Sequence, residues 1–356
     1  MIIKETFALE WVKQINQEQG WNRKSDQFKN IEKAIMALKL LEDLRLSGIN
    51  FIFRGGTALL ILLEKLYRFS VDIDIVIEDE VGYKERFDAV CKGAFIRWDE
   101  QNRNTDRKSN TKHYRFYYKP FVDDSEEGYI LLDVYEGKAL YSEVQQVSLK
   151  SPLLKTDDKN VYIAIPTVDC ILADKLTAFA PHTIGIGLSS EPGKRPKRVE
   201  ILKQMFDIAN LFDRCQNLES IKETYIKIAE AEIKMADLRC SYQETLRDSF
   251  NFALMVGFDG RNQKDEFDVL SKGYNEFSKF VTDLSFDKWK AILCASKIAY
   301  LISCITNNKP IENYNDKLDL SELTIKDKKY KAFESYLYSS PESYYYFVKA
   351  INGVSL

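Results

Sequence analysis

The segment Val71–Ile77 constrains the fold most, because it is rich in β-branched residues and over its first half alternates acidic and apolar residues like a two-faced β-strand. Successive strand residues point to opposite faces of a sheet, so Asp72 and Asp74 share one face with Cα atoms about 6 to 7 Å apart. Ile73, Ile75 and Ile77 point to the other face and enter a core. Two carboxylates roughly 5 Å apart repel each other by about 3 kcal/mol at an effective dielectric constant of 20. We expect a cation to compensate them.

A hard divalent cation would meet this requirement. Mg²⁺ (or Mn²⁺) binds to one or two carboxylates and takes its other ligands from phosphate oxygens and water. In phosphoryl transfer such an ion neutralises charge that develops on the transferred group. The pattern therefore predicts a metal site at Asp72 and Asp74, although a solvated sheet face or ion pairs with Lys and Arg would also explain these two residues.

A glycine turn precedes the acidic strand. Asn50–Arg54 is rich in β-forming residues, Gly55 and Gly56 interrupt it, and Thr57–Leu66 has the pattern of an apolar helix. Backbone N–H groups and the helix dipole at such a junction form an anion site, which would place a triphosphate beside the aspartates. Close packing of the helix would also explain the glycine pair. Neither G-x-G-x-x-G nor G-x-x-x-x-G-K-[ST] occurs, which argues against dinucleotide-binding and P-loop proteins.

A third acid interrupts another apolar segment. Asp133 lies within the strand expected at Tyr129–Glu136. As a third carboxylate it is a candidate metal ligand or a general base that activates an acceptor hydroxyl. A charge on an edge strand is the equally open alternative.

The patterning changes at Pro166, which predicts an α+β protein with a mixed α/β core at 1–165 and a helical region at 166–356. In the core we expect a helix at Asp26–Leu46, a helix near Tyr83–Trp98, and further strands at His113–Lys119 and Val161–Ile165. In the second region we expect helices near Thr167–Ala180, Val199–Phe212, Leu218–Met235, Tyr242–Val256, Phe267–Leu284, Asp287–Thr306 and Lys329–Tyr338.

Composition narrows the class of protein. A formal net charge of -3 provides no global basic field, so any contact with nucleic acid must be local. The six cysteines show no C-x-x-C spacing and only two histidines occur, which favours a reduced cytoplasmic protein without structural zinc. No stretch approaches the roughly 18 to 20 apolar residues that span a bilayer, so we expect no membrane partner.

Three motifs in order carry a resemblance to a known family. They are Arg54–Leu59 (RGGTAL), Arg68–Ile75 (RFSVDIDI) and Ala173–Ala178 (ADKLTA). In these motifs the chain resembles the AbiEii/AbiGii toxin family, which comprises nucleotidyltransferase-like proteins of bacterial toxin–antitoxin and phage-defence systems and includes the MenT toxins. The resemblance covers roughly residues 50–215, and the later sequence matches only as a helical region.

The resemblance implies a polymerase-β-like nucleotidyltransferase core followed by a helical C-terminal part. The implied activity is transfer of NMP from an NTP to an acceptor, which is tRNA in studied relatives, and a winged-helix antitoxin is commonly encoded beside the toxin. By position, the metal-binding acids are Asp72 and Asp74, the phosphate-binding turn is Gly55, Gly56 and Thr57, and the nucleotide-binding residues of the helical part are Lys175 and the retained acid Asp207. Lys175 and Asp207 would then extend into the catalytic cleft, and Arg68 and Ser70 would contact phosphate or hold the loop.

The chain departs from the family pattern after Lys175. Pro181 and His182 stand where family members usually carry a basic residue, and Gln204 stands where they carry an acid. The inserted segment contains the basic run Lys194–Arg198, which offers cations for the phosphates of RNA or NTP, although a solvated loop explains it equally. Two alternatives therefore stay open: a catalytically altered protein that binds a nucleotide or a partner, and a nucleotidyltransferase that modifies a protein hydroxyl.

Overall fold

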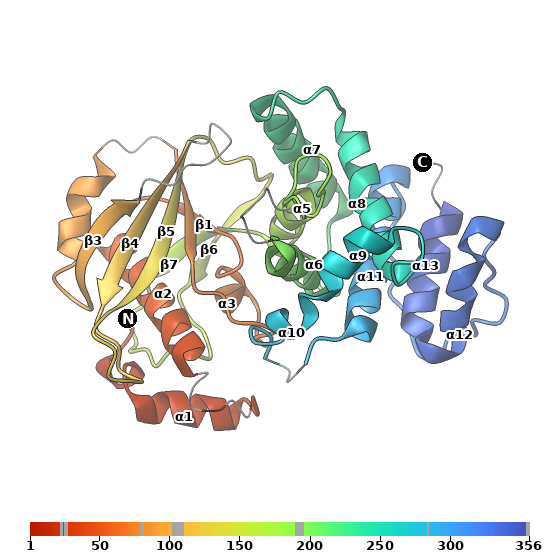
Figure 1. Ribbon diagram of the computed structural model, residues 1–356. Coiled ribbons are helices and arrows are strands. Elements are labelled where there is room, and N and C mark those ends of the chain that lie inside the picture. Colours follow the sequence, from red (N-terminus) through yellow and green to blue (C-terminus); the bar gives the residue numbers. More distant parts are fainter. Residues whose placement is uncertain are drawn as a thin grey trace. The chain divides into compact units, whose positions relative to one another are not determined.

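The chain folds into two compact units, shown in a computed structural model that describes residues 1–21, 24, 28–78, 82–101, 110–188, 196–282 and 285–353 (Figure 1). Unit 1 comprises Met1–Ala139, Glu143–Thr167 and Phe280–Leu284, and unit 2 comprises Leu140–Ser142, Val168–Lys279 and Ser285–Leu356. Unit 1 contains a mixed sheet and unit 2 is helical. The predicted α+β class is therefore confirmed.

Unit 1 is built on a seven-stranded sheet with the strand order β3-β4-β5-β2-β1-β7-β6. Its strands are β1 (Ile52–Arg54), β2 (Ile73–Ile77), β3 (Phe95–Gln101), β4 (Thr111–Tyr118), β5 (Gly128–Glu136), β6 (Val144–Ser148) and β7 (Tyr162–Pro166). The pairs β2–β5 and β1–β7 are parallel, and the other neighbours are antiparallel. The strands expected around 50–54, 71–77, 113–119, 129–136 and 161–165 all occur.

Helices complete the described part of unit 1. They are η1 (Lys4–Thr6), α1 (Leu9–Glu18), α2 (Phe28–Leu46), α3 (Leu59–Leu62), η3 (Tyr83–Arg86) and α4 (Phe87–Val90). α2 is buried along most of its length and packs on β5. Ile75 of β2 and Leu132 of β5 are fully buried, whereas the alternate residues Asp74 and Asp133 keep partial exposure. The alternation read from the sequence thus separates a core face from an open face.

The helix expected at 83–98 is wrong over its second half. Only η3 and α4 are helical, and the chain then forms β3, which pairs with β4. Pairing is favoured because it brings the ring of Phe95 to 5.9 Å from that of Phe116 and the ring of Trp98 to 5.2 Å from that of Phe87. Such packing between distant segments overrides the local helical pattern.

Two further details of unit 1 differ from expectation. The helix expected at 57–66 shortens to the four residues of α3, because Leu63 is extended with φ -105° and ψ 130°. Strand β6 was not expected, since its exposed polar residues lack alternation, and it pairs with β7 at the edge of the sheet.

Unit 2 is all helical among its described residues. Its helices are α5 (Val168–Ala178), α6 (Arg198–Phe212), α7 (Leu218–Met235), α8 (Tyr242–Gly257), α9 (Lys264–Ser271), α10 (Tyr274–Phe277), α11 (Lys288–Asn307), η4 (Lys328–Ser335), α12 (Tyr336–Ser339) and α13 (Pro341–Gly353). α11 packs against α6, α8 and α13. This described helix is long and apolar enough to cross a membrane, but 78% of its apolar window is buried in the fold.

Side-chain caps explain why several of these helices begin where the sequence predicts. Ser241 and Glu244 form a capping box at the start of α8, and Asp287 accepts a hydrogen bond from the Lys290 N–H (3.0 Å) at the start of α11. The helix expected at 267–284 is wrong, because α9 ends before Gly273 and only the short α10 follows. The last expected helix is divided into η4 and α12, while α1 and α13 were missed.

One short segment returns to unit 1 and fixes the residues before the acidic strand. Arg68 forms an antiparallel bridge with Val281, and the Thr282 N–H donates to the Tyr67 carbonyl at 2.8 Å. This pairing holds the backbone of Arg68 in place.

Candidate active site

The glycine turn after β1 is shaped by two polar side chains that lie against it. Gly55 has a φ of +79°, a conformation that glycine adopts without strain, and a Cβ added there would collide with the Asp74 carboxylate. A Cβ on Gly56 would collide with the Arg68 guanidinium and lie 2.9 Å from Ser70 Oγ. The two glycines are therefore needed because Asp74 and Arg68 occupy the space of their missing side chains.

Thr57 clamps this turn to the acidic segment. Its side chain is fully buried, and its hydroxyl lies 2.5 Å from the Asp72 carbonyl oxygen and 2.9 Å from Ser70 Oγ. Because a carbonyl only accepts, the single Thr57 proton goes to Asp72, and the Ser70 hydroxyl then donates to Thr57. The Thr57 side chain thus fixes the position of residues 70–72.

The positive charge at the turn comes from a side chain rather than from a long helix. The helix α3 has four residues, so its dipole is much smaller than that of the ten-residue helix expected there. Arg68 is 7% exposed, its guanidinium lies against Gly56, and its Nη1 donates to the Phe69 carbonyl at 3.0 Å. Arg68 is therefore the cation best placed to meet a phosphate at the turn.

A row of charged residues crosses the open face of the sheet. Asp74 of β2 is in register with Arg54 of β1 and with Asp133 of β5, and Asp133 is in register with His113 of β4. Registered neighbours point to the same face. We call Arg54, Asp74, Asp133 and His113 the acid row. Sheet pairing begins at Ile73, so Asp72 lies immediately before β2 rather than inside it, and its side chain is exposed.

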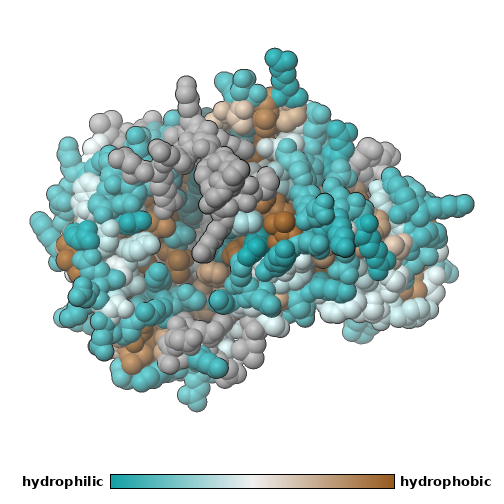
Figure 2. All heavy atoms as spheres, viewed as in Figure 1, coloured by the Kyte–Doolittle hydropathy of each residue, from teal (hydrophilic) through white to brown (hydrophobic). Residues whose placement is uncertain are grey.

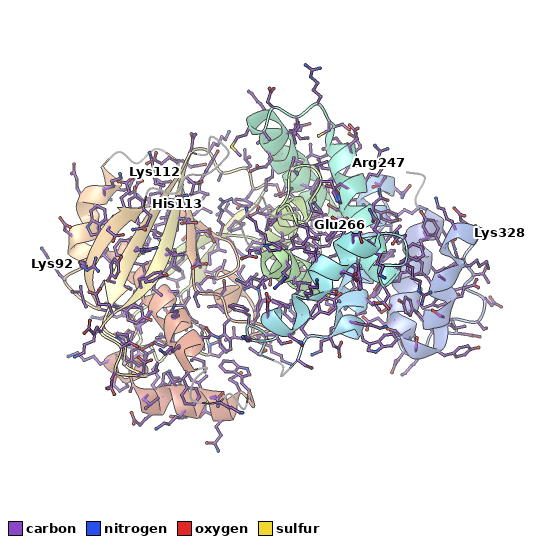
Figure 3. All side chains as sticks on the ribbon, viewed as in Figure 1. Lys92, Lys112, His113, Arg247, Glu266 and Lys328 are labelled. Atoms are coloured by element: carbon purple, nitrogen blue, oxygen red, sulfur yellow. The ribbon has the colours of Figure 1, made fainter. Side chains whose placement is uncertain are left out.

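His113 orients the third carboxylate of the site. His113 Nδ1 lies 2.8 Å from Asp133 Oδ1, and their side chains are 12% and 24% exposed. An ionised carboxylate only accepts hydrogen bonds, which assigns the proton to Nδ1. Figure 3 labels His113 on β4. The sequence did not point to His113, because its partner is set by strand register.

The electrostatics of the acid row favour an added cation. Asp74 and Asp133 occupy registered positions on neighbouring strands, which stand about 4.8 Å apart. Two carboxylates at that spacing repel by about 3 kcal/mol at an effective dielectric constant of 20. Arg54 at one end of the row offsets part of this repulsion, and its guanidinium also lies 5.8 Å from the Tyr135 ring centroid.

The carboxylates suit a metal site that a bound nucleotide completes, and they do not suit a site built from protein side chains alone. Within the described residues, no group of three or more His, Cys, Asp or Glu side chains is arranged to hold a metal ion unaided. A Mg²⁺ ion that binds together with a nucleotide needs only one or two carboxylates, since phosphate oxygens and water complete its shell. Asp74 against the glycine turn, with Asp72 and Asp133 beside it in the chain and in the sheet, suits that second type.

The two remaining predicted residues form a buried pair in unit 2. Lys175 of α5 and Asp207 of α6 are 7% and 2% exposed, and Lys175 Nζ lies 3.1 Å from Asp207 Oδ2. Lys175 Nζ also donates to Gln204 Oε1 at 3.2 Å. The glutamine that departs from the family pattern is thus a direct partner of the lysine. Lys175 and Asp207 belong to unit 2, whereas the turn and the acid row belong to unit 1.

His182, the other residue that departs from the family pattern, links two carboxylates of unit 2 through its two ring nitrogens. Its Nδ1 lies 2.7 Å from Asp248 Oδ1 and its Nε2 lies 2.8 Å from Glu266 Oε1. Burial lowers the pKa of His182, but the hydrogen bond to Asp248 and the charges of Glu266 and Asp248 outweigh it and raise the pKa above 6.5. The basic run Lys194–Arg198 that follows lies partly outside the described residues.

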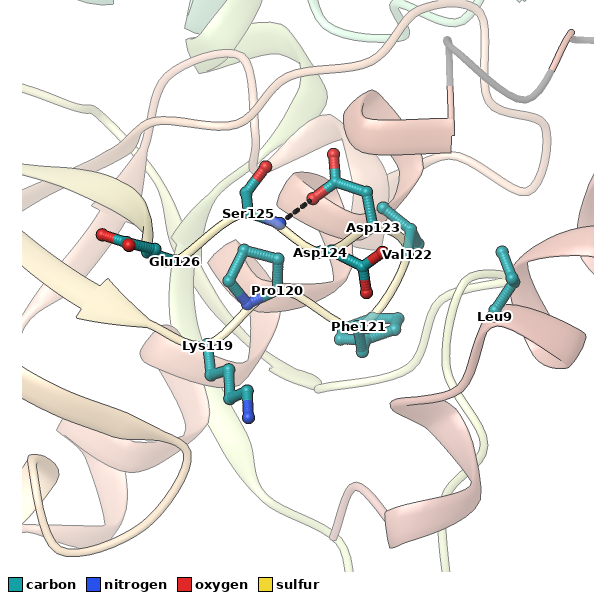
Figure 4. Close-up of a pocket in the computed structure, with 9 residues that line it drawn as sticks. All are labelled: Leu9, Lys119, Pro120, Phe121, Val122, Asp123, Asp124, Ser125 and Glu126. Carbon is teal, nitrogen blue, oxygen red and sulfur yellow. Dashed lines mark hydrogen bonds between the residues drawn. The ribbon is translucent and has the colours of Figure 1, made fainter.

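An open hollow of about 770 Å³ lies at the connection between β4 and β5 (Figure 4). It is lined by Leu9, Lys119, Pro120, Phe121, Val122, Asp123, Asp124, Ser125 and Glu126. None of the residues predicted for the site lines it, and its acidic side chains do not suit a triphosphate.

Comparisons with known proteins show the family and the fold of this chain. A family model described as "Nucleotidyl transferase AbiEii toxin, Type IV TA system" matches residues 39–292, more than half of the chain. No protein with a curated description matches the sequence.

Among solved structures, MenT4, a nucleotidyltransferase toxin from Mycobacterium tuberculosis, aligns with a TM-score of 0.52 and 12% identity over 94% of this chain and 98% of that chain. JHP933 from Helicobacter pylori aligns with a TM-score of 0.45 and 15% identity over 78% of this chain and 95% of that chain. At this identity the likeness to MenT4 establishes the fold.

Proposed function

We propose a specific reaction for this chain, which belongs to the AbiEii family of nucleotidyltransferase toxins of type IV toxin–antitoxin systems. In this proposal the protein transfers NMP from an NTP to an RNA hydroxyl. The acceptor is tRNA, and the cofactor is Mg²⁺ or Mn²⁺. The observation that supports this most is the registered pair Asp74 and Asp133, with the Asp74 carboxylate lying against the glycine turn. This arrangement puts carboxylates beside a turn that a triphosphate can approach.

The proposed reaction exchanges one phosphoester bond for another. The oxygen of the acceptor hydroxyl bonds to the α-phosphorus of the NTP, the bond from that phosphorus to the oxygen bridging to the β-phosphate breaks, and pyrophosphate leaves. The hydroxyl proton passes to a carboxylate, a role that we assign to Asp133. His113 holds Asp133 by one oxygen, which limits rotation of the carboxylate.

The other residues of unit 1 bind and position the nucleotide in this proposal. Asp72, Asp74 and Asp133 would hold the metal ion, which when bound supplies neutralisation of negative charge on the transferred group. Gly55 and Gly56 let the phosphates approach the backbone, and the Arg68 guanidinium at Gly56 attracts them. Thr57 and Ser70 keep the loop in place through their hydroxyl contact.

Lys175 enters the proposal through the family pattern and through its chemistry. A lysine binds phosphate as a point charge, and here Asp207 and Gln204 hold the buried Lys175 Nζ in one orientation. We assign nucleotide phosphate binding to Lys175 and the positioning of that lysine to Asp207. A cognate antitoxin, a role in phage defence and a cytoplasmic location complete the proposal.

A transfer assay tests the proposal. The protein is incubated with each α-³²P-labelled NTP, total tRNA, and Mg²⁺, Mn²⁺ or EDTA. We expect label on tRNA with at least one NTP, and its loss with EDTA or with Asp74→Asn. Asp158→Asn, a change of another exposed acid of unit 1, is the matched control and should keep full activity. Absence of label under every condition, from a protein that also binds no NTP, would sink the proposal.

A second function is favoured by one contact. Because Gln204 replaces the usual acid and takes one Lys175 hydrogen bond, a protein that binds the nucleotide without turnover is the main competitor. In that case NTP binds, no label is transferred, and Asp74→Asn leaves the growth phenotype of expressing cells intact. Mass spectrometry of total protein detects the third possibility, transfer to a protein hydroxyl.

A further inference from the structure

The open face of unit 1 extends from the acid row onto an aromatic and basic surface. On β4 and β5 the side chains alternate between the core and this face, so that Tyr117 pairs with Tyr129 and Arg115 pairs with Leu131 on the open side. Arg97 of β3 pairs with Tyr117. We call Arg97, Arg115, Tyr117 and Tyr129 the Arg–Tyr face. Figure 2 shows mainly hydrophilic side chains on the molecular face that it draws.

In the Arg–Tyr face each guanidinium lies over one tyrosine ring, and the two rings are tilted by 55° to each other. The Arg97 guanidinium carbon lies 3.5 Å from the Tyr117 ring centroid, and that of Arg115 lies 4.8 Å from the Tyr129 centroid. The two tyrosine rings are 6.1 Å apart. Tyr129 is 39% exposed, and none of the four is buried. Flat, partly exposed rings and guanidinium planes are the surfaces on which unpaired bases stack.

The cations of this face differ in how closely the described carboxylates approach them. Arg97 has two carboxylate partners, since its Nη2 lies 2.8 Å from Glu127 Oε2 and its Nη1 lies 3.7 Å from Asp99 Oδ2. Arg115 differs, because no carboxylate among the described residues lies within ion-pair distance and its Nε donates to no acceptor there. Lys33 adds a second cation, with Nζ 5.4 Å from the Tyr129 centroid. Two cations around a tyrosine suit a polyanion that carries bases.

The same strands connect the Arg–Tyr face to the acid row. Tyr129 and Asp133 lie four residues apart on one face of β5, which corresponds to about 13 Å along a strand. That length accommodates about four bases at the ~3.4 Å rise of a stacked strand. His113 and Tyr117 are likewise four residues apart on β4. An RNA strand that stacks on Tyr129 and runs along β5 would reach Asp133 within about four nucleotides.

We propose that the Arg–Tyr face binds the single-stranded end of the RNA acceptor by base stacking and delivers its terminal hydroxyl to the acid row. The inference rests on the proposed function, from which it takes the identity of the reaction. Binding of RNA to the Arg–Tyr face does not depend on that reaction. Arginine and tyrosine are also common in protein interfaces. RNA is favoured because no carboxylate of the described residues lies within ion-pair distance of Arg115, and because the surface leads along β4 and β5 to Asp133 and its neighbour Asp74.

Binding of a defined probe tests the face independently of turnover. The probes are 5′-fluorescein RNA octamers of mixed sequence, single-stranded or annealed to a complement, and the readout is fluorescence anisotropy at several salt concentrations. We expect the single strand to bind more tightly than the duplex. Tyr129→Ala should weaken binding about 5- to 150-fold, the range for loss of one stacking contact, while Tyr129→Phe should retain it. Arg115→Gln should weaken binding and reduce its salt dependence.

Matched controls separate the face from general effects. Tyr338 is 91% exposed and Arg247 is exposed on α8, so Tyr338→Ala and Arg247→Gln remove the same side chains elsewhere and should bind RNA like the parent protein. In the transfer assay, Tyr129→Ala should raise KM for RNA while kcat and NTP binding stay unchanged.

The outcomes distinguish this inference from the proposed function. If the protein binds single-stranded RNA through Tyr129 and Arg115 but transfers no label, RNA binding by the Arg–Tyr face is supported and the proposed transfer reaction is contradicted. If label is transferred and the face variants match the parent in both RNA affinity and KM, the face is overturned. Loss of antitoxin binding in the same variants, with RNA affinity unchanged, would instead identify a protein interface and also overturn the inference.

Discussion

Gly55 offers the sharpest test of how the carboxylates are placed. Its φ is +79° and an added Cβ would collide with the Asp74 carboxylate, whereas Gly20 has a φ of +64° with nothing within 4 Å of an added Cβ. Gly20→Ala therefore measures backbone strain alone. Gly55→Ala adds the displacement of Asp74 to the same strain.

The expected magnitudes follow from these contacts. The left-handed conformation costs alanine about 1–2 kcal/mol, and the loss of chain entropy in the unfolded state returns about 0.4–1 kcal/mol, so Gly20→Ala should cost roughly 1 kcal/mol. Gly55→Ala should cost a further ~1–3 kcal/mol from overpacking. A catalytic group displaced by about 1 Å lowers the rate about 100-fold. We expect Gly20→Ala to keep its transfer activity and Gly55→Ala to lose it.

Urea unfolding and the tRNA-labelling assay measure the two effects. The double variant Gly55→Ala/Asp74→Ala removes the collision, so its free energy of unfolding should return toward that of Gly20→Ala while it stays inactive. The reasoning is refuted if Gly55→Ala unfolds like Gly20→Ala and transfers label at the parent rate, because Asp74 would then not lie against the turn.

Three further predictions concern stability and nucleotide binding. Asp207→Ala leaves Lys175 buried without its carboxylate and should cost about 3–5 kcal/mol in urea unfolding, and Lys175→Met/Asp207→Leu should recover most of it; equal losses in both variants would contradict a coupled pair. Thr57→Val removes the hydroxyl that holds the Asp72 carbonyl, so it should cost about 1–3 kcal/mol and raise KM for NTP. An unchanged KM would rule out this clamp. Because the folded-state pKa of His182 is raised above 6.5, its contribution to stability is complete below about pH 6.5 and is lost as pH rises through the folded value. The unfolding midpoint should fall over that range, and His182→Gln should flatten the fall; an identical pH profile in both proteins would speak against the bridge.

Much of the fold could be predicted because its signals are local. The alternation around Asp74, the apolar period of α2 and the caps of α8 and α11 act within a few residues, so the corresponding elements appear where expected. The failures concern segments whose partners are distant. β3 forms because β4 offers it an edge and an aromatic cluster, and local propensity alone reads the region as helix.

The candidate site divides in the same way. Asp72, Asp74, Gly55 and Gly56 were visible in the sequence, because a turn and an alternating strand are features of neighbouring residues. The role of His113 was not visible, since it depends on the register that places His113 beside Asp133.

The sequence by itself determined the residue types of the candidate site: carboxylates in and just before one strand, a glycine turn ahead of them, and a lysine on a later helix. Tertiary structure alone decided which groups meet, because strand register and helix packing join residues far apart in the chain. It set Asp133 beside Asp74, placed the Arg68 guanidinium against Gly56, and joined Lys175 to Asp207 and Gln204. Pairing energies between distant residues depend on the whole sheet or helix bundle, and no local pattern records them.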